Sequence, residues 1–235
     1  MNQKIFISSI PKSGTHLLAS VVNLINNEYP ISVTKSSIET FNFEKYKSRP
    51  CLLGHFRVNN ISGNAKLKEL ILDRSLLILI RDPRDIVNSM VNFLPNSPNS
   101  YHKLLSKQLD GKSYQEQIIT VANGLKLENS DIEVSDIRRH CAGFVNFSSV
   151  AKTMHVIKYE DFFDGEIVEK IAEIFNIEIE VANTYVSEAM SSKTKTKRQD
   201  GGRPYGWRTE FNQEIKDFFV KEYSDVILNL GYKLY

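Results

Sequence analysis

The segment Ile5–Thr15, with the sequence IFISSIPKSGT, joins a short apolar run to a turn that contains proline, lysine and glycine. The run is rich in β-branched residues, as strands are, and apolar side chains recur at helical spacing from Leu17 to Ile25. A strand, a glycine-containing turn and a helix in this order begin a βαβ unit. The turn at residues 11–15 is a predicted anion site, because a lysine and the N–H groups of a helix N-terminus both attract negative charge.

Three further apolar runs continue the alternation of strands and helices, at residues 51–54, 76–80 and 154–159. The run 76–80 is apolar on both faces, as a central parallel strand covered by helices must be. Helical patterns follow from about Asp82, from 166 to 175 and from 212 to 230. We therefore predict an α/β fold: a single domain over residues 1–235 with a mainly parallel central sheet flanked by helices. Residues 93–147 are interpreted as a helical cap.

The composition excludes several classes of protein. The chain has 235 residues, with 30 Lys and Arg against 28 Asp and Glu, and this near balance argues against a nucleic-acid-binding polycation. Two cysteines outside any metal-ligand spacing, Cys51 and Cys141, favour a reduced, cytoplasmic protein. The N-terminal apolar run is too short for a signal peptide, and no run approaches the ~20 residues that span a bilayer. Oligomeric state is left open.

The turn at residues 11–15 differs from a nucleoside triphosphate P-loop. A P-loop reads GxxxxGK[ST], whereas Lys12 here precedes Gly14. A second basic turn, RDPRD at residues 81–85, follows the apolar run 76–80. Its carboxylates, Asp82 and Asp85, lie beyond an arginine, so they do not match the strand-end carboxylate that holds a metal. A charged residue such as Arg81 directly after an apolar strand is typical of a functional site. A small-molecule kinase and a non-catalytic nucleotide-binding protein of the same fold remain as alternatives.

Four segments resemble, in order along the chain, motifs of the cytosolic-type sulfotransferases, which use 3′-phosphoadenosine 5′-phosphosulfate (PAPS). Residues 11–15 (PKSGT) resemble the 5′-phosphosulfate loop of that family, and residues 81–89 (RDPRDIVNS) resemble its 3′-phosphate motif. Residues 158–162 (KYEDF) resemble a segment whose tyrosine lies near the adenine, and residues 198–211 (RQDGGRPYGWRTEF) resemble the C-terminal lid. The basic segment 193–211 is accordingly interpreted as a lid.

The resemblance implies an activity and a set of site residues. The sulfuryl group would pass from PAPS to a hydroxyl of a small-molecule, lipid or carbohydrate acceptor, leaving adenosine 3′,5′-bisphosphate (PAP), with no metal. His55, in the sequence LGHFR after the second strand, matches the place of the catalytic histidine. Lys12 would stabilise the leaving group, and Ser89 would act with them. The implied donor-binding residues are Lys12, Ser13, Gly14, Thr15, His16, Arg81, Ser89, Tyr159, Arg198, Gly202 and Arg203.

The chain departs from the family pattern at three places. Leu53 stands where a lysine often precedes the catalytic histidine, and His16 follows the loop where a tryptophan often stacks on adenine shortly after it. The usual Arg-Lys-Gly triplet of the lid is replaced by RQD and GGR at residues 198–203, so the arginine that meets the 3′-phosphate is left open. Arg84 and Asp85 are interpreted as a structural pair.

The acceptor is indicated only by the composition of the cap. Aromatic and apolar residues there are typical of a core, and some of them are candidates for lining an acceptor pocket. They favour a phenol, a lipid or a natural-product alcohol over a polyanionic polysaccharide. The candidates are Phe93, Leu94, Tyr101, Tyr114, Phe144 and Phe147.

Overall fold

The computed structural model describes residues 4–34, 43–144, 151–192 and 203–235. The chain forms two compact units, of which unit 1 comprises Met1–Arg81 and Gly143–Gln199. Unit 2 comprises Asp82–Ala142 and Asp200–Tyr235. Each unit is built from two stretches of chain, and the first passage from unit 1 to unit 2 falls between Arg81 and Asp82, just after the strand Ser75–Ile80. The prediction of a single domain over the whole chain stays a prediction.

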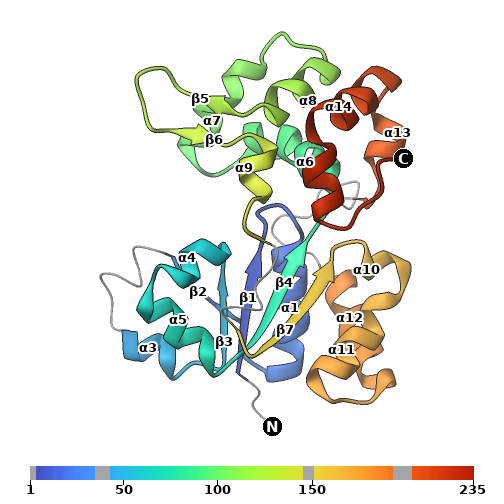
Figure 1. Cartoon of the computed structure of the whole chain (residues 1–235). Coiled ribbons are helices and arrows are strands. Elements are labelled where there is room, and N and C mark those ends of the chain that lie inside the picture. Colours follow the sequence, from blue (N-terminus) through green and yellow to red (C-terminus); the bar gives the residue numbers. More distant parts are fainter. Residues whose placement is uncertain (1–3, 35–42, 145–150, 193–202) are drawn as a thin grey trace. The chain divides into compact units, whose positions relative to one another are not determined.

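Unit 1 contains a five-stranded parallel sheet (Figure 1), as predicted. Its strands are β1 (Ile5–Ser9), β2 (Ile31–Ser32), β3 (Cys51–Gly54), β4 (Ser75–Ile80) and β7 (Thr153–Lys158). Their order across the sheet is β2-β3-β1-β4-β7. The interior strands β1, β3 and β4 are buried at every position. Because β2 has only two residues, no sequence periodicity could predict it.

The helices of unit 1 pack against the sheet through apolar side chains. A core cluster joins β1, β3, β4 and β7 to α1, α11 and α12 through residues such as Ile7, Leu79, Leu18, Ile171 and Val186. Figure 1 shows α4 and α5 on the β3 side of the sheet and α11 beside β7, while α3 contacts α5 and α12 packs against α11 and α1. The helices are α1 (Thr15–Asn26), α3 (Phe43–Lys47), α4 (Val58–Ser62), α5 (Ala65–Leu72), α10 (Asp161–Asp164), α11 (Glu166–Phe175) and α12 (Ile179–Ser191).

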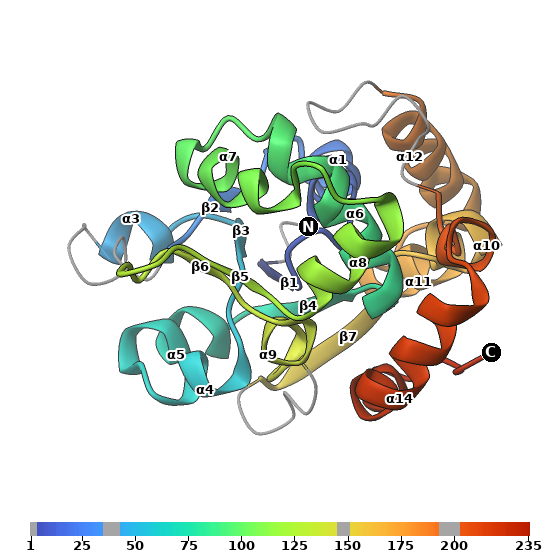
Figure 2. The same ribbon diagram turned by 90° about the horizontal axis from the view of Figure 1, so that it is seen from above.

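Unit 2 is mainly helical and is centred on α6 (Pro83–Asn96), which contacts five other helices of the unit (Figure 2). The side chain of Asp82 caps this helix by accepting from the N–H of Arg84, and Pro83 occupies its first turn. The unit also contains a short antiparallel hairpin, with two residues in each strand, that the helical-cap prediction lacks. The other elements are α7 (Ser100–Ser106), η1 (Lys107–Leu109), α8 (Tyr114–Ala122), β5 (Leu125–Lys126), β6 (Glu133–Val134), α9 (Ile137–Cys141), α13 (Trp207–Glu210) and α14 (Gln213–Asn229).

The interpretation of Arg84 and Asp85 as a pair is wrong. The guanidinium of Arg84 instead donates to Asp82, from Nε to Oδ1 at 2.9 Å and from Nη2 to Oδ2 at 2.7 Å. It also donates to the carbonyls of Lys233 and Leu234 at 2.6 and 2.7 Å, and lies 3.5 Å from the ring centroid of Trp207. The backbone N–H of Trp207 donates to Asp85. The start of α6 therefore anchors both α13 and the C-terminal residues.

The basic segment 193–211 is described only from Arg203 onward. Arg198 and Gly202, two predicted donor-binding residues, lie outside the described residues. The described part of the segment contains one helical turn, α13 (Trp207–Glu210), and the interpretation of residues 193–211 as a lid stays a prediction.

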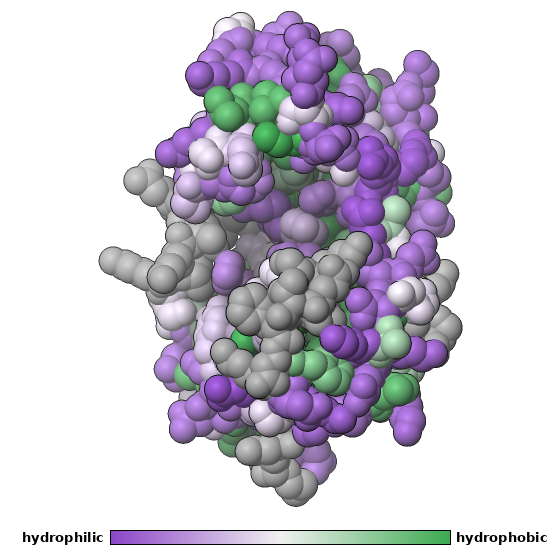
Figure 3. Space-filling view, turned by 90° about the vertical axis from the view of Figure 1, so that its left-hand side faces the viewer, coloured by the Kyte–Doolittle hydropathy of each residue, from purple (hydrophilic) through white to green (hydrophobic). Residues whose placement is uncertain are grey.

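The surface in Figure 3 is mostly hydrophilic, with hydrophobic residues in small groups. Within the part of the chain that the structure describes, no helix is both long and apolar enough to cross a bilayer. Cys51 in unit 1 and Cys141 in unit 2 are both buried, and neither forms a disulfide.

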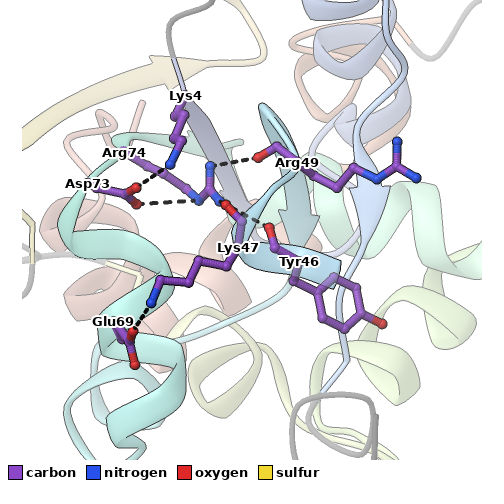
Figure 4. Close-up of polar contacts among 7 residues, drawn as sticks. All are labelled: Lys4, Tyr46, Lys47, Arg49, Glu69, Asp73 and Arg74. Carbon is purple, nitrogen blue, oxygen red and sulfur yellow. Dashed lines mark hydrogen bonds and ion pairs between the residues drawn. The ribbon is translucent and has the colours of Figure 1, made fainter. Parts of the chain in front are cut away.

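Arg74 fixes the amino-terminal side of the sheet in unit 1 (Figure 4). The residue precedes β4 and is buried, and its guanidinium donates to the backbone carbonyls of Tyr46, Lys47 and Arg49 at 2.9–3.1 Å. Burial lowers the pKa of this guanidinium, although an arginine stays protonated at any ordinary pH. Arg74 thus ties the segment that leads into β3 to the start of β4.

We expect Arg74→Ala to lower the free energy of unfolding by about 2–4 kcal/mol, because three carbonyls lose a buried charged donor. Lys47→Ala is the matched control, because its ion pair with Glu69 is exposed to solvent and should contribute far less to stability. Urea denaturation of both variants measures the difference. Equal losses for the two variants would contradict a structural role for Arg74.

Candidate active site

The turn after β1 has an unusual backbone. The N–H of Ser13 donates to the carbonyl of Ile10 at 3.1 Å, which places Pro11 at the first corner and Lys12 at the second. Lys12 has a φ of 74°, the positive value that the second corner of a type II turn requires. A lysine there carries about 1–3 kcal/mol of strain, and strain of this kind gathers at functional sites. The carbonyl of Lys12 accepts from Nη1 of Arg81 at 3.2 Å.

Gly14 brings this turn against the ring of Tyr159. Its φ is 86°, and a Cβ atom at this position would lie 2.4 Å from Cδ2 of Tyr159. The guanidinium carbon of Arg81 lies 4.3 Å from the centroid of the same ring. The register explains this grouping: Ile80 pairs with Lys158, so Arg81 and Tyr159 follow neighbouring strand ends. Lys12, Gly14, Arg81 and Tyr159 therefore cluster at the carboxyl ends of β1, β4 and β7.

If this turn binds PAP, as the sequence resemblance implies, we expect Gly14→Ala to weaken that binding by roughly tenfold or more, because the new methyl group would displace Tyr159 or the turn. Gly165→Ala is a matched control, since Gly165 has the same φ of 86° but no atom within 4 Å of the position that its new methyl group would take. Both variants carry the backbone strain of a positive φ, about 1 kcal/mol. Calorimetric titration with PAP separates the steric effect at Gly14 from that strain, and equal affinities would argue against a close approach.

The hydroxyl of Ser13 is fully buried and has no hydrogen-bond partner among the residues that the structure describes. A buried hydroxyl without a partner costs about 1–3 kcal/mol. Groups of this kind are rare in native proteins and commonly belong to functional sites. At the N-terminus of α1, whose first residue is Thr15 and whose cap Gly14 offers no side chain, Ser13 adds a polar atom to the predicted anion site.

His55 directly follows β3 and is held by the end of β1. Because Ser8 pairs with Gly54, the next residues of the two strands, Ser9 and His55, are neighbours. Nδ1 of His55 lies 2.8 Å from the carbonyl oxygen of Ser9 and 3.1 Å from its hydroxyl. A carbonyl only accepts, so Nδ1 carries the proton and Nε2 keeps its lone pair. This tautomer leaves Nε2 able to accept a proton.

The protein lowers the pKa of His55 below its ordinary value of 6.5. Desolvation by neighbouring atoms is the main cause, even though the residue is exposed at the surface, and the charge of His16 adds to it. The hydrogen bond to the Ser9 backbone acts in the opposite direction. The imidazole is therefore neutral at pH 7, as a base must be.

Ser8 and Ser9 are residues of the site that sequence reasoning missed. The hydroxyl of Ser8 donates to the carbonyl of Phe56 at 2.7 Å and accepts from its N–H at 3.2 Å. The hydroxyl of Ser9 lies 2.8 Å from that of Thr15. Both serines are fully buried. The signal available in the sequence was the presence of two adjacent serines in a strand that is otherwise apolar.

The remaining predicted residues that the structure describes are His16, Ser89 and Arg203, of which His16 directly follows Thr15 and acts on His55 through its charge. His16 is exposed, with Nδ1 3.3 Å from the hydroxyl of Tyr29. Ser89 belongs to α6 of unit 2, and Arg203, also in unit 2, is exposed. Unit 1 thus brings together Lys12, Ser13, Gly14, Thr15, His55, Arg81 and Tyr159.

The candidate acceptor residue Tyr114 has polar partners in unit 2. Its hydroxyl donates to Asn88 and to Glu210, and Asn88 also donates to Glu210. Across the described ranges there is no group of three His, Cys, Asp or Glu side chains that could hold a metal ion.

A parallel sheet with a lysine- and glycine-containing turn between its first strand in the chain and a helix is typical of α/β proteins that bind phosphate groups. Residues 2–225 match the model of the sulfotransferase domain family, which covers most of the chain. The chain therefore belongs to the sulfotransferase domain family, a family of enzymes that transfer sulfuryl groups. No curated protein sequence matches it.

Solved structures share the fold at low sequence identity. Mouse sulfotransferase SULT7A1 complexed with PAP is 18% identical with a TM-score of 0.62, and the match covers 98% of this chain and 88% of that one. Retinol dehydratase in complex with androsterone and the inactive cofactor PAP is 14% identical with a TM-score of 0.57, over 99% and 82% of the two chains. Both relatives support the α/β fold that the sequence predicts.

Proposed function

We propose that this chain transfers a sulfuryl group from PAPS to the hydroxyl of a small acceptor. The observation that carries the proposal is the strained turn at Lys12, packed with Arg81 and Tyr159 at the strand ends of a chain in the sulfotransferase domain family. PAPS has an anionic group at each end and an adenine between them. The two solved relatives were crystallised with PAP, the product that PAPS would leave.

The donor would lie along the carboxyl ends of the strands in unit 1. Lys12, Ser13 and Thr15 would bind the phosphosulfate, because the turn offers an ammonium group, hydroxyls and the N-terminus of α1. Arg81 would donate two N–H bonds to the 3′-phosphate, and Tyr159 would contact the adenine. On the sequence resemblance alone we retain the other predicted donor-binding residues: His16, Ser89, Arg198, Gly202 and Arg203.

The transfer itself is an in-line displacement. Nε2 of His55 would take the proton of the acceptor hydroxyl while the acceptor oxygen attacks sulfur. The bond between sulfur and the bridging oxygen breaks, and its electron pair leaves with PAP. Lys12 would stabilise the charge that develops on the leaving phosphate. The bonds made and broken balance without a metal, and Ser89 is proposed to assist on the family motif only.

For the acceptor we retain a small-molecule, lipid or carbohydrate hydroxyl, with a phenol or lipid alcohol favoured by the aromatic residues of unit 2. We also retain a cytoplasmic location and no nucleic-acid partner. Incubating the protein with labelled PAPS and pools of alcohols, phenols and sugars tests the activity directly. Label transfer to none of the pools, alongside tight PAP binding, would favour the non-catalytic nucleotide-binding protein.

The kinase alternative is tested by a thermal-shift comparison. Sulfuryl transfer predicts that PAP raises the melting temperature equally with and without EDTA. It also predicts that Arg81→Ala reduces this shift and that His55→Ala does not. A kinase would respond to ATP with Mg²⁺ and would lose the response on chelation. A shift with Mg²⁺-ATP and none with PAP would overturn the proposal.

A further inference from the structure

Three hydrogen-bonding groups in unit 1 form a continuous chain of contacts from His55 to the anion-binding turn. Nδ1 of His55 lies 3.1 Å from the hydroxyl of Ser9, and the hydroxyl of Ser9 lies 2.8 Å from that of Thr15. Ser9 is fully buried, and Thr15 is 8% exposed. The contact joins the proposed base to a residue of the proposed donor site.

The directions of these hydrogen bonds follow from the protonation of His55. Since Nδ1 carries the proton for the Ser9 carbonyl, the Ser9 hydroxyl accepts a share of the same N–H. The one proton of that hydroxyl is then left to donate to Thr15. The hydroxyl of Thr15 accepts the hydrogen bond from Ser9, so its own proton remains available. Because Thr15 is the first residue of α1, it can donate that proton to an anion bound at the turn. Along this series of hydrogen bonds from His55 through Ser9 to Thr15, each donor therefore points toward the predicted anion site.

We propose that Ser9 is a positioning residue that couples occupancy of the anion site to the strength of His55 as a base. An anion that accepts from Thr15 polarises each hydroxyl of the chain in turn, because hydrogen bonds in series strengthen one another. The Nδ1–H bond of His55 becomes stronger, and Nε2 becomes more basic. The inference rests on the proposed function, which places the phosphosulfate of the donor at Thr15.

The coupling has a chemical use. With the anion site empty, desolvation and the charge of His16 lower the pKa of His55. Donor binding would raise that pKa again, so that the base is strongest when the sulfuryl group is in place. His16 on α1 is the titratable group whose charge acts on His55 among the described residues, and the side chain of Arg57, two positions on, lies against Gly143 instead.

The test is an NMR titration of the five histidines in the full chain, with and without saturating PAP. His55→Asn assigns the resonance, and nitrogen–proton correlations report which ring nitrogen carries the proton. PAP should raise the pKa of His55 by about one unit in the wild type. In Ser9→Ala about half of this shift or less should remain, because the charge of PAP then acts on His55 only through space. Ser9→Thr keeps a hydroxyl at this position and should show the full shift.

Ser8→Ala is the matched control, because it removes a buried hydroxyl from the neighbouring position and leaves the hydrogen bonds from His55 through Ser9 to Thr15 intact. It should keep the full shift. If Ser9→Ala does not fold, Thr15→Val breaks the same chain at its other end and should reduce the shift at saturating PAP.

Two outcomes overturn the inference. One is an unchanged His55 pKa when PAP binds to the wild type, and the other is an equal shift in the wild type and in Ser9→Ala. Calorimetry distinguishes these from failure of the proposed function: a protein that does not bind PAP contradicts the donor, whereas one that binds PAP without the Ser9-dependent shift contradicts only the coupling.

Discussion

Replacement of His55 by alanine is expected to lower the rate of sulfuryl transfer by about 10²–10⁴-fold, the range that general acid–base groups contribute. The acceptor hydroxyl is a weak nucleophile until its proton is removed, and the tautomer held by the Ser9 carbonyl leaves Nε2 to remove it. The affinity for PAP should stay within about threefold of wild type, because the imidazole is not assigned to the donor. Initial rates with labelled PAPS and calorimetry with PAP measure the two quantities separately.

The pH dependence gives an independent check on His55. Its pKa in the free protein is lowered, so the imidazole stays neutral as the pH falls through the ordinary value of 6.5 and is protonated only at lower pH. With PAPS as the varied substrate, the acid limb of kcat/KM should therefore lie below 6.5 in the wild type and disappear from the residual activity of His55→Ala. Near-wild-type rates in His55→Ala would show that another group is the base.

Long patterns in this sequence predicted the fold well because burial leaves a strong periodic signal. The run from Leu76 to Ile80 is apolar throughout, and β4 covers Ser75–Ile80. The predicted helix at 166–175 is α11, whose apolar residues lie on one face. By contrast β2 and the β5–β6 hairpin have two residues per strand, and backbone pairing with neighbouring elements defines them rather than any pattern of their own.

Polar pairings were predicted less well, because neighbours in sequence are not neighbours in space. Arg84 and Asp85 are adjacent, but the helix cap turns the carboxylate of Asp82 toward the guanidinium and leaves Asp85 to accept from Trp207. The roles of Ser8 and Ser9 depend on the register of β1 with β3, which no single-strand pattern contains. The motifs thus identified which residues gather at the strand ends, and the sheet register supplies the partners of each.

Lys12→Ala is expected to remove most of the activity and to weaken PAP binding as well. A charge-assisted hydrogen bond to a phosphate contributes about 1.5–3 kcal/mol, so PAP affinity should fall roughly 10–100-fold. The rate should fall further, by about 10²–10³, because the ammonium group also stabilises charge that appears only as the S–O bond breaks. Lys68→Ala, which removes an exposed lysine from α5, is the control for loss of one positive charge and should change neither quantity.

The backbone of Lys12 allows its chemistry to be separated from its effect on the fold. With a φ of 74°, alanine keeps the strain of the turn, whereas glycine relieves about 1–2 kcal/mol of it. Lys12→Gly should therefore be more stable to urea than Lys12→Ala, while both lose activity and PAP affinity to the same degree. If the glycine variant recovered activity, the turn alone would be the important feature. Equal loss in both variants, with higher stability for glycine, would mean that the chain tolerates strain here because the ammonium group is needed at this corner.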